Sequence, residues 1–341
     1  MTSQDLKILN GTGKGVPGLK AKTHPYILAL GLIGAAITSM ILMFAAVLAI
    51  TPTLWSSVSE VQASSLHTRS GPGPDITLPV PCHSHNDYWR PAPFYSAIEA
   101  GCIGIEADVW NVQNELYVGH DLGDLSSSKT LSRMYIHPLV ESLLARNIDR
   151  DPSLPPRGIY PRKPDQTVVL LVDLKADPDT SWPLLLNALE PLRRKGWLSY
   201  VSDGQFVSRP ITVVGTGETE FHHVDNATPS RDVFFDAPLR ELEQGQYNNT
   251  NSYYASVSFE QSIGPVGSKG LMPEQLAKLR RQISQAHNRG LKTRYWGMPY
   301  WPLRIRNQLR ELLLDEGVDV LNVDNLLEAR DIFAQRGHLI E

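Results

Sequence analysis

Eight apolar runs of strand length recur between Ile76 and the C-terminus of this 341-residue chain. They are centred near residues 80, 105, 170, 213, 234, 257, 294 and 321. The run Val168–Asp173 is continuously apolar until its last residue, which is typical of a parallel strand buried on both faces. Strands that alternate with helices over residues 76–341 predict a (β/α)8 barrel, whose usual size is about 250 residues. A doubly wound open sheet is the alternative.

Helical patterns separate several of these runs. The segments Ser181–Lys195, Pro273–Asn288 and Pro302–Glu316 each place apolar residues on one face, which predicts amphipathic helices. The stretch Leu122–Thr167 is longer than a simple connection between a strand and a helix. We interpret it as an insertion or a lid over the rim of the barrel.

Polar side chains gather where the first predicted strands end. His85 and Asn86 follow the first run, Glu106 and Asp108 end the second, and His120 follows a short segment at 116–118. In a barrel of parallel strands these ends share one rim, where active sites lie. Residues two apart on a strand point the same way, so the two carboxylates suit one hard cation.

The later strands end in polar residues as well. Asp173 and Lys175 follow the third run and join the candidate site, although an ordinary strand-end ion pair is the alternative. We interpret Asp236, Ser258 and Asp324 as hydrogen-bonded rim residues outside the site. Trp296 either walls the substrate pocket or packs as a buried aromatic residue.

The motifs His85-Asn86-Asp87-Tyr88, Glu106-x-Asp108 and Gly119-His120, in this order, resemble the catalytic core of the phospholipase C-like phosphodiesterases. Within that superfamily, Pro81–Trp110 and the whole layout are similar to the fungal "altered inheritance of mitochondria protein 6" family. The resemblance runs from Leu78 towards the C-terminus and implies the barrel fold. The His-Arg-Gly and Pro-Glu-Asn motifs of many glycerophosphodiester phosphodiesterases are missing, which puts that substrate class in doubt.

The resemblance and the chemistry of a phosphodiester together imply a metal-dependent phosphoric diester hydrolase. The oxygen ligands for Mg²⁺ or Ca²⁺ are expected to be Asn86, Glu106, Asp108 and Asp173. Lys175 is expected to bind the substrate phosphate. His85 and His120 are expected to act as general base and general acid, in an order that the sequence does not assign. His83, two residues before His85, is the alternative to it.

The N-terminal part of the chain predicts a membrane anchor. Residues 25–50 contain no charged side chain and exceed the roughly 20 residues that cross a bilayer as a helix, with a cleaved signal peptide as the alternative. Residues 1–24 form a basic tail, which predicts a cytosolic N-terminus. Residues 51–75 are rich in Ser, Thr, Gly and Pro and predict a linker, which leaves the barrel in a lumen or outside the cell.

Two further features concern that compartment. Cys82 and Cys102 begin neighbouring strands and form either a disulfide or two small buried residues. The sequons at Asn226 and Asn248 are compatible with glycosylation. The net charge of −4 and the lack of a basic tract with interleaved aromatic residues argue against a nucleic acid partner.

The sequence therefore leaves three functions open. The first is a membrane-anchored phosphodiesterase that acts on a phospholipid or a glycerophosphodiester. The second is a catalytically inactive barrel that binds phosphorylated headgroups or has a structural role at a membrane. The third is a glycoside hydrolase, in which Glu106 and Asp108 would be the two acting carboxylates.

Overall fold

The computed structural model describes residues 77–225, 231–268 and 270–337. The predicted basic tail, membrane span and linker lie outside these residues, and so does the sequon at Asn226. No helix in the described part of the chain is long and apolar enough to cross a bilayer.

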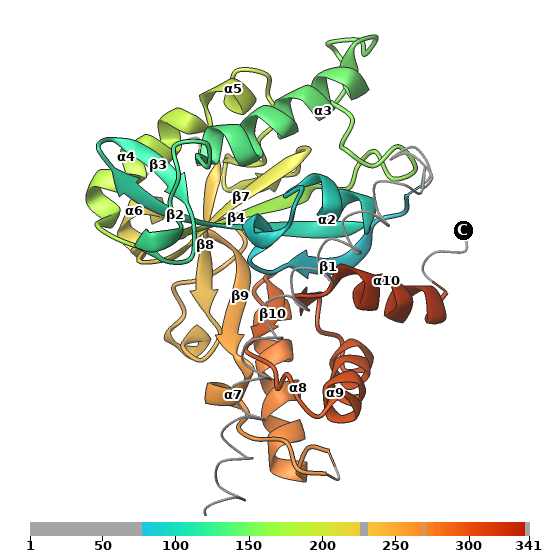
Figure 1. Cartoon of the computed structure of the whole chain (residues 1–341). Helices are drawn as coiled ribbons and strands as arrows, with labels where there is room; N and C mark the ends of the chain where they lie inside the picture. The colour runs from blue at the N-terminus through green and yellow to red at the C-terminus, as the bar shows by residue number, and fades with distance from the viewer. Residues whose placement is uncertain (1–76, 226–230, 269, 338–341) are drawn as a thin grey trace, which may run out of the picture. The chain divides into compact units, whose positions relative to one another are not determined.

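Eight parallel strands close into a barrel (Figure 1). Each strand pairs with its neighbour in the order β1-β11-β10-β9-β8-β7-β4-β2, and β2 pairs with β1. The strands are β1 (Val80–Ser84), β2 (Cys102–Val112), β4 (Val168–Leu174), β7 (Ile211–Gly217), β8 (Val233–Pro238), β9 (Ser252–Ser258), β10 (Lys292–Trp296) and β11 (Val320–Val323). This closure confirms the predicted barrel and excludes the open sheet, because an open sheet would leave β1 and β2 unpaired with each other.

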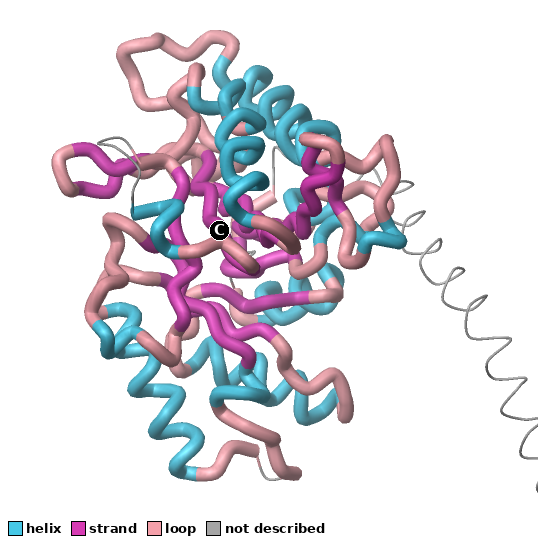
Figure 2. The backbone as a smooth tube through the Cα atoms, turned by 90° about the vertical axis from the view of Figure 1, so that its left-hand side faces the viewer, coloured by secondary structure: helices cyan, strands magenta, loops and turns pink. Residues whose placement is uncertain are grey.

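Helices surround the strands, as the rotated view shows (Figure 2). They are α2 (Tyr95–Glu99), α3 (His137–Asn147), α4 (Pro178–Ala188), α5 (Glu190–Arg193), α6 (Phe221–Asp225), α7 (Phe259–Ser262), α8 (Pro273–His287), α9 (Leu303–Asp315) and α10 (Leu326–Gln335). Short helical turns lie at η2 (Asp87–Trp89), η3 (Leu122–Asp124) and η4 (Ser132–Ile136). The apolar faces of the long helices pack on the outer side of the strands and form the main core.

Two sequence predictions about helices need correction. The segment Ser181–Lys195 is not one helix, because α4 ends at Ala188 and α5 begins at Glu190. Pro191 has no N–H to continue the hydrogen bonds of α4 and restricts the residue before it. The stretch Leu122–Thr167 is not simply a lid, because it contains α3, whose buried Leu139 and Leu143 belong to the main core. Parallel β2 and β4 require such a crossover helix.

The inside of the barrel changes character along its axis. A separate apolar cluster includes Val169, Leu171, Val214 and Phe234, all buried, and Phe206 packs against it. Phe206 belongs to a small hairpin that precedes β7 and that the sequence did not predict, β5 (Tyr200–Ser202) with β6 (Gln205–Val207). Further along the same strands, towards their carboxyl ends, the inward residues are polar. The barrel is therefore closed by apolar side chains at its base and lined by polar ones at its rim.

Two local features bring the first polar residues to the rim. A disulfide joins Cys82 of β1 to Cys102 of β2, with 4.6 Å between the Cα atoms, which decides between the two interpretations of these cysteines. Beyond the rim, β2 turns back through Gln113 and Asn114, both with positive φ, into the antiparallel strand β3 (Glu115–Val118). Asparagine tolerates this left-handed backbone in a tight hairpin. The hairpin returns the chain to the rim just before His120.

Candidate active site

Three of the predicted ligands form one cluster at the rim. Asp108 of β2 lies directly opposite Asp173 of β4, and Glu106 lies one inward position deeper on β2. Carboxylate oxygens from the three residues lie within 4.8 Å of one another. These oxygens come from neighbouring strands, so the barrel itself fixes their positions.

The oxygens of this cluster fit a divalent cation. One oxygen of Asp108 and one of Asp173, Oδ1 in both cases, are buried and have no hydrogen-bond partner among the described residues. A buried oxygen of a carboxylate without a partner costs folding free energy, unless a ligand supplies the missing interaction. An all-oxygen set of this kind is the chemistry that Mg²⁺ and Ca²⁺ prefer.

Lys175 lies among the same carboxylates. Its Nζ atom is 2.8 Å from Asp108 Oδ2 and 2.9 Å from Asp173 Oδ2. Burial raises the pKa of Asp173 to about 6; Lys175 opposes that shift and the nearby Asp108 adds to it. The predicted phosphate-binding cation is thus at the site, and it holds two crowded carboxylates together.

Asn86 joins the cluster through Tyr88, which sequence reasoning missed. The Tyr88 hydroxyl lies 2.9 Å from Asn86 Oδ1, 2.8 Å from Asp108 Oδ2 and 3.3 Å from His120 Nδ1. A single hydroxyl proton serves one of these oxygens, so another is left as a free acceptor. Burial and the neighbouring Asp108 raise the pKa of Tyr88, which keeps the hydroxyl protonated. Asn86 itself has φ 46°, a left-handed turn that asparagine tolerates.

A carboxylate contacts Nδ1 of each predicted catalytic histidine. His85 Nδ1 lies 2.7 Å from Asp324 Oδ1, and His120 Nδ1 lies 3.3 Å from Asp108 Oδ2. A carboxylate only accepts hydrogen bonds, so the His85 ring carries a proton on Nδ1, whereas His120 Nδ1 lies equally close to Asp108 and to the Tyr88 hydroxyl. No described group is hydrogen-bonded to Nε2 of either ring. Each imidazole is therefore oriented by a carboxylate and keeps one nitrogen for proton transfer.

Asp324, interpreted from the sequence as a hydrogen-bonded rim residue outside the site, forms its hydrogen bond with the predicted catalytic His85. Its contact with His85 joins residues 239 positions apart. Burial alone would raise the pKa of Asp324, but the hydrogen bond from His85 keeps that pKa below its usual range. Asp324 thus remains a carboxylate and orients the imidazole. Trp296, at the end of β10, is 39% exposed and is not a buried packing residue.

The alternative catalytic histidine, His83, lies deeper in the barrel. Its side chain is fully buried, and its Nε2 atom is 3.5 Å from Glu106 Oε2. Burial and the charge of Arg294 lower the pKa of His83 to about 4. A neutral ring without solvent access is unsuited to exchange protons with a substrate, which favours His85.

Arg294 is another residue that sequence reasoning missed. Its guanidinium group donates to Glu106 Oε2 at 2.9 Å and to Asn322 Oδ1 at 2.9 Å, inside the barrel. Burial would raise the pKa of Glu106, but Arg294 and His83 hold that pKa well below its usual range. Glu106 is therefore ionised, as a ligand must be, with its Oε2 atom already engaged. A permanently ionised Glu106 does not suit the general acid of a glycoside hydrolase.

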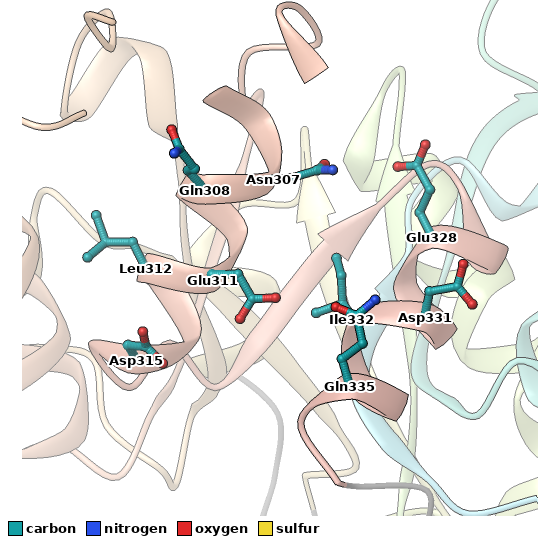
Figure 3. A pocket seen from close by; sticks show the side chains of 9 residues that line it. All are labelled: Asn307, Gln308, Glu311, Leu312, Asp315, Glu328, Asp331, Ile332 and Gln335. Carbon is teal, nitrogen blue, oxygen red and sulfur yellow. The ribbon is translucent and has the colours of Figure 1, made fainter. Parts of the chain in front are cut away.

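A surface hollow of about 660 Å³ lies away from the rim, between α9 and α10 (Figure 3). It is lined by Glu311, Asp315 and Glu328 among other residues. Arg336 pairs with Glu311 and Asp315, and Arg310 pairs with Glu328. Because these acidic side chains are neutralised within the protein, we assign no site to the hollow.

Comparisons with known proteins point to the same family as the motifs of the site. A family model described as the AIM6-like phosphodiesterase domain matches residues 74–236, which contain all seven predicted site residues. The chain is 38% identical over 316 residues to the altered inheritance of mitochondria protein 6 homolog of Arthroderma benhamiae, covering 86% of this chain and 99% of that protein.

More distant relatives have the same name. The altered inheritance of mitochondria protein 6 of Eremothecium gossypii is 35% identical over 268 residues, covering 74% of this chain and 69% of that protein. The Saccharomyces cerevisiae protein is 34% identical over 278 residues, covering 74% and 71%. A glycerophosphodiester phosphodiesterase structure from Parabacteroides distasonis has a TM-score of 0.43 at 15% identity, covering 77% of this chain and 99% of that chain. We draw nothing from a likeness of that size.

Proposed function

The chain belongs to the altered inheritance of mitochondria protein 6 family, and from that premise we propose that it hydrolyses a phosphodiester at the barrel rim. The observation that carries this proposal is the convergence of two carboxylate-held imidazoles with three carboxylates around one rim. Binding alone needs no acid and base, so the arrangement favours turnover over an inactive barrel. The proposed substrate is a phospholipid or a glycerophosphodiester.

The two imidazoles supply the proton transfers. With Nδ1 held by Asp324 in one case and by Asp108 in the other, Nε2 of His85 and of His120 can each accept or donate a proton. One ring removes the proton from the attacking water or substrate hydroxyl. The other ring gives a proton to the oxygen that leaves the phosphorus atom. Because both rings are oriented in the same manner, the geometry assigns neither role to a particular histidine.

The remaining residues stabilise charge. A divalent cation, Mg²⁺ or Ca²⁺, held by Asn86, Glu106, Asp108 and Asp173 would neutralise the negative charge that develops on the phosphoryl oxygens. Lys175, which contacts two of these carboxylates, is placed to reach a phosphate bound beside them. Tyr88 keeps Asp108 and Asn86 in position.

We also propose the cellular arrangement that the sequence predicts. A single span at residues 25–50 would anchor the protein with its N-terminus in the cytosol and the barrel in a lumen or outside the cell. The Cys82–Cys102 disulfide supports an oxidising compartment for the barrel. Glycosylation at Asn248, which is half-buried at a turn, is part of the same proposal.

The test is a hydrolysis screen with the whole chain in detergent, over lipid and soluble phosphodiesters. Chelation should abolish turnover, and Mg²⁺ or Ca²⁺ should restore it. His85→Ala and His120→Ala should each lower turnover by about 10² or more. His287→Ala is the matched control, because His287 contacts Asp319 at 2.7 Å as His85 contacts Asp324. Normal turnover in the double histidine variant or in chelator would falsify the proposal.

A further inference from the structure

Exposed apolar side chains are concentrated at the rim. Twelve large apolar side chains are exposed among the described residues, and nine of them lie either at the last residue of a strand or between the carboxyl end of a strand and the first turn of a helix that follows it. Every exposed tryptophan of the described residues is in this group: Trp89, Trp296 and Trp301. An even scatter of exposed apolar residues would need no explanation, but an accumulation at one end marks an interaction surface.

Six of these nine residues lie on one side of the rim. Trp89 follows β1, Leu327 follows β11, Trp296 ends β10, and Tyr300, Trp301 and Leu303 follow β10. Strands β1, β11 and β10 are consecutive neighbours in the barrel. We refer to these six residues as the apolar arc.

The opposite side of the rim is acidic. The loops and first helical turns after β4 and β7 contain four exposed carboxylates, Asp177, Asp179, Glu218 and Glu220, of which Asp179 and Glu220 contact histidines of α6. Because anionic groups avoid apolar surfaces and the headgroups of anionic lipids, this side is unsuited to contact a membrane. We therefore expect the acidic side of the rim to face water and the apolar arc to be covered by a partner.

The residues of the arc match the interface of a lipid bilayer. Tyr300, Trp301, Pro302 and Leu303 form four consecutive exposed residues, and Tyr300 and Trp301 are 66% and 71% exposed. Tryptophan and tyrosine concentrate at the headgroup level of membranes, where an apolar ring and a polar tip are both accommodated. The exposed Arg304, which follows this run, can contact phosphate groups.

The apolar arc is continuous with the candidate active site. The Trp89 ring lies 5.6 Å from the His120 ring, centroid to centroid, and is 62% exposed. Whatever covers Trp89 therefore lies beside the proposed acid-base pair. A bilayer at this position would present phosphodiester headgroups directly to the rim.

The N-terminal sequence predicts that the chain is tethered to a bilayer. About 25 residues rich in Ser, Thr, Gly and Pro, at 51–75, separate the predicted span from the barrel. As a general rule, a Gly- and Ser-rich chain of 25 residues has an end-to-end distance of roughly 25–30 Å. The barrel would thus stay close to the membrane that anchors it.

We propose that the apolar arc docks on a phospholipid surface and that the substrate is a phospholipid in that surface, not a soluble glycerophosphodiester. The choice of substrate rests on the proposed function, whereas docking does not. The tilt follows from the two sides of the rim: β1, β11 and β10 face the lipid, and β4 and β7 face water.

The test uses the full chain in phospholipid nanodiscs and measures contact and turnover separately. Contact is measured as the quenching of tryptophan fluorescence by brominated phosphatidylcholine. Turnover is measured on phosphatidylcholine, phosphatidylethanolamine and phosphatidylglycerol in the disc, and on bis(p-nitrophenyl) phosphate in solution. The variant is Tyr300→Ala/Trp301→Ala. Its matched control is Leu144→Ala/Ile148→Ala, which removes exposed apolar area (45% and 82% exposed) near the C-terminal end of α3, away from the rim.

We expect the arc variant to lose the quenching of Trp89 and Trp296, whereas Trp55, next to the predicted span, should stay quenched in both chains. The arc variant should cleave lipid at least about tenfold more slowly, with hydrolysis of the soluble diester unchanged. The control should match the native chain in all three measurements. Quenching that is the same in the native chain and the arc variant would overturn docking, even if lipid is hydrolysed. Loss of quenching in a chain that cleaves no diester would support docking and refute the proposed function. If the native chain shows no quenching of Trp89 and Trp296 but forms dimers in detergent that the arc variant does not form, the arc binds a second copy of the chain, which also overturns the proposal.

Discussion

At the rim, Asp108 and Asp173 each keep a buried oxygen without a hydrogen-bond partner among the described residues, and Lys175 bridges them. One layer below, Glu106 is ion-paired with Arg294, which is 3% exposed and also bonded to Asn322. Both layers thus combine carboxylates with a single cation. The upper one has buried acceptors without a hydrogen-bond partner among the described residues, directly beneath the rim, and the lower one is enclosed deeper in the barrel.

This difference indicates that the upper layer binds ligands and that the lower layer supports the fold. In the upper layer, an incoming cation or phosphate can exchange with Lys175, because its ammonium group is on a flexible chain and partly exposed. In the lower layer, the planar guanidinium of Arg294 is fixed by two acceptors and has no access to water. We infer that substitutions in the upper layer change turnover first, and that those in the lower layer change stability first.

The largest effect is expected at Asp108. It contacts Lys175, Tyr88 and His120 and has the orphaned oxygen, so Asp108→Asn removes charge from every part of the proposed chemistry. Turnover should fall to the level without enzyme, with a change in unfolding free energy of less than about 1 kcal/mol. Activity assays and denaturant unfolding of the same preparation check both. A fully active, or an unfolded, variant would contradict the assignment of Asp108 to the binding layer.

The next effect tests the buried ion pair. Arg294→Met leaves the Glu106 carboxylate buried without its cation, which should destabilise the protein by about 3–5 kcal/mol. Adding Glu106→Gln to that variant should recover much of the loss, because the uncompensated charge is then gone. Lys175→Met is the comparison at the rim, where we expect at most about 1 kcal/mol. Equal losses in Arg294→Met and Lys175→Met would remove the distinction between the two layers.

A third effect concerns the response of the lower layer to acid. His83 has a folded-state pKa near 4 against an ordinary value of 6.5, so its stabilising contribution is complete above pH 6.5 and is lost as the pH falls towards 4. That loss amounts to about 3 kcal/mol, at about 1.4 kcal/mol per pKa unit. In metal-free buffer, His83→Gln should therefore lose less stability than the native chain over this range. Parallel pH profiles would show that His83 binds protons equally in the folded and unfolded chain, so that burial does not lower its pKa.

The fold was largely predictable because its signals are local. Strand-length apolar runs and period-two alternation placed the ends of β1, β2 and β4, and parallel topology then placed His85, Glu106, Asp108 and Asp173 at one rim. The local pattern wrongly predicted one continuous helix where the structure has two. Ser181–Lys195 has the periodicity of one helix, but Pro191 interrupts its hydrogen bonds.

The missed residues depend on contacts that no local pattern contains. The direction of Tyr88 follows from the left-handed turn at Asn86, and the contact of Asp324 with His85 spans nearly the whole barrel domain. Arg294 did leave a signal, since a charged residue in the middle of the strand Lys292–Trp296 must face a polar interior. What the strand alone could not show is that Glu106 and Asn322 are its partners.

The smallest effect has the opposite pH dependence and belongs to the rim. Asp173 has a folded-state pKa of about 6, above its ordinary 3.8, so its contribution to stability is present below pH 3.8 and is lost as the pH rises through 6. In metal-free buffer at pH 7, Asp173→Asn should thus be more stable than the native chain by about 1–2 kcal/mol, after allowance for partial exposure. Near pH 4 the two should be equal.

Adding Mg²⁺ or Ca²⁺ should reverse this order, because a cation that binds the folded state stabilises the native carboxylate and has little to bind in Asp173→Asn. Thermal unfolding of both chains, with and without cation, measures the crossover directly. If Asp173→Asn is less stable at pH 7 without metal, the Asp173 carboxylate is already satisfied by Lys175, and the rim does not need a cation. A gain without metal and a loss with it would show that this carboxylate is kept at a cost to stability because the cation requires it.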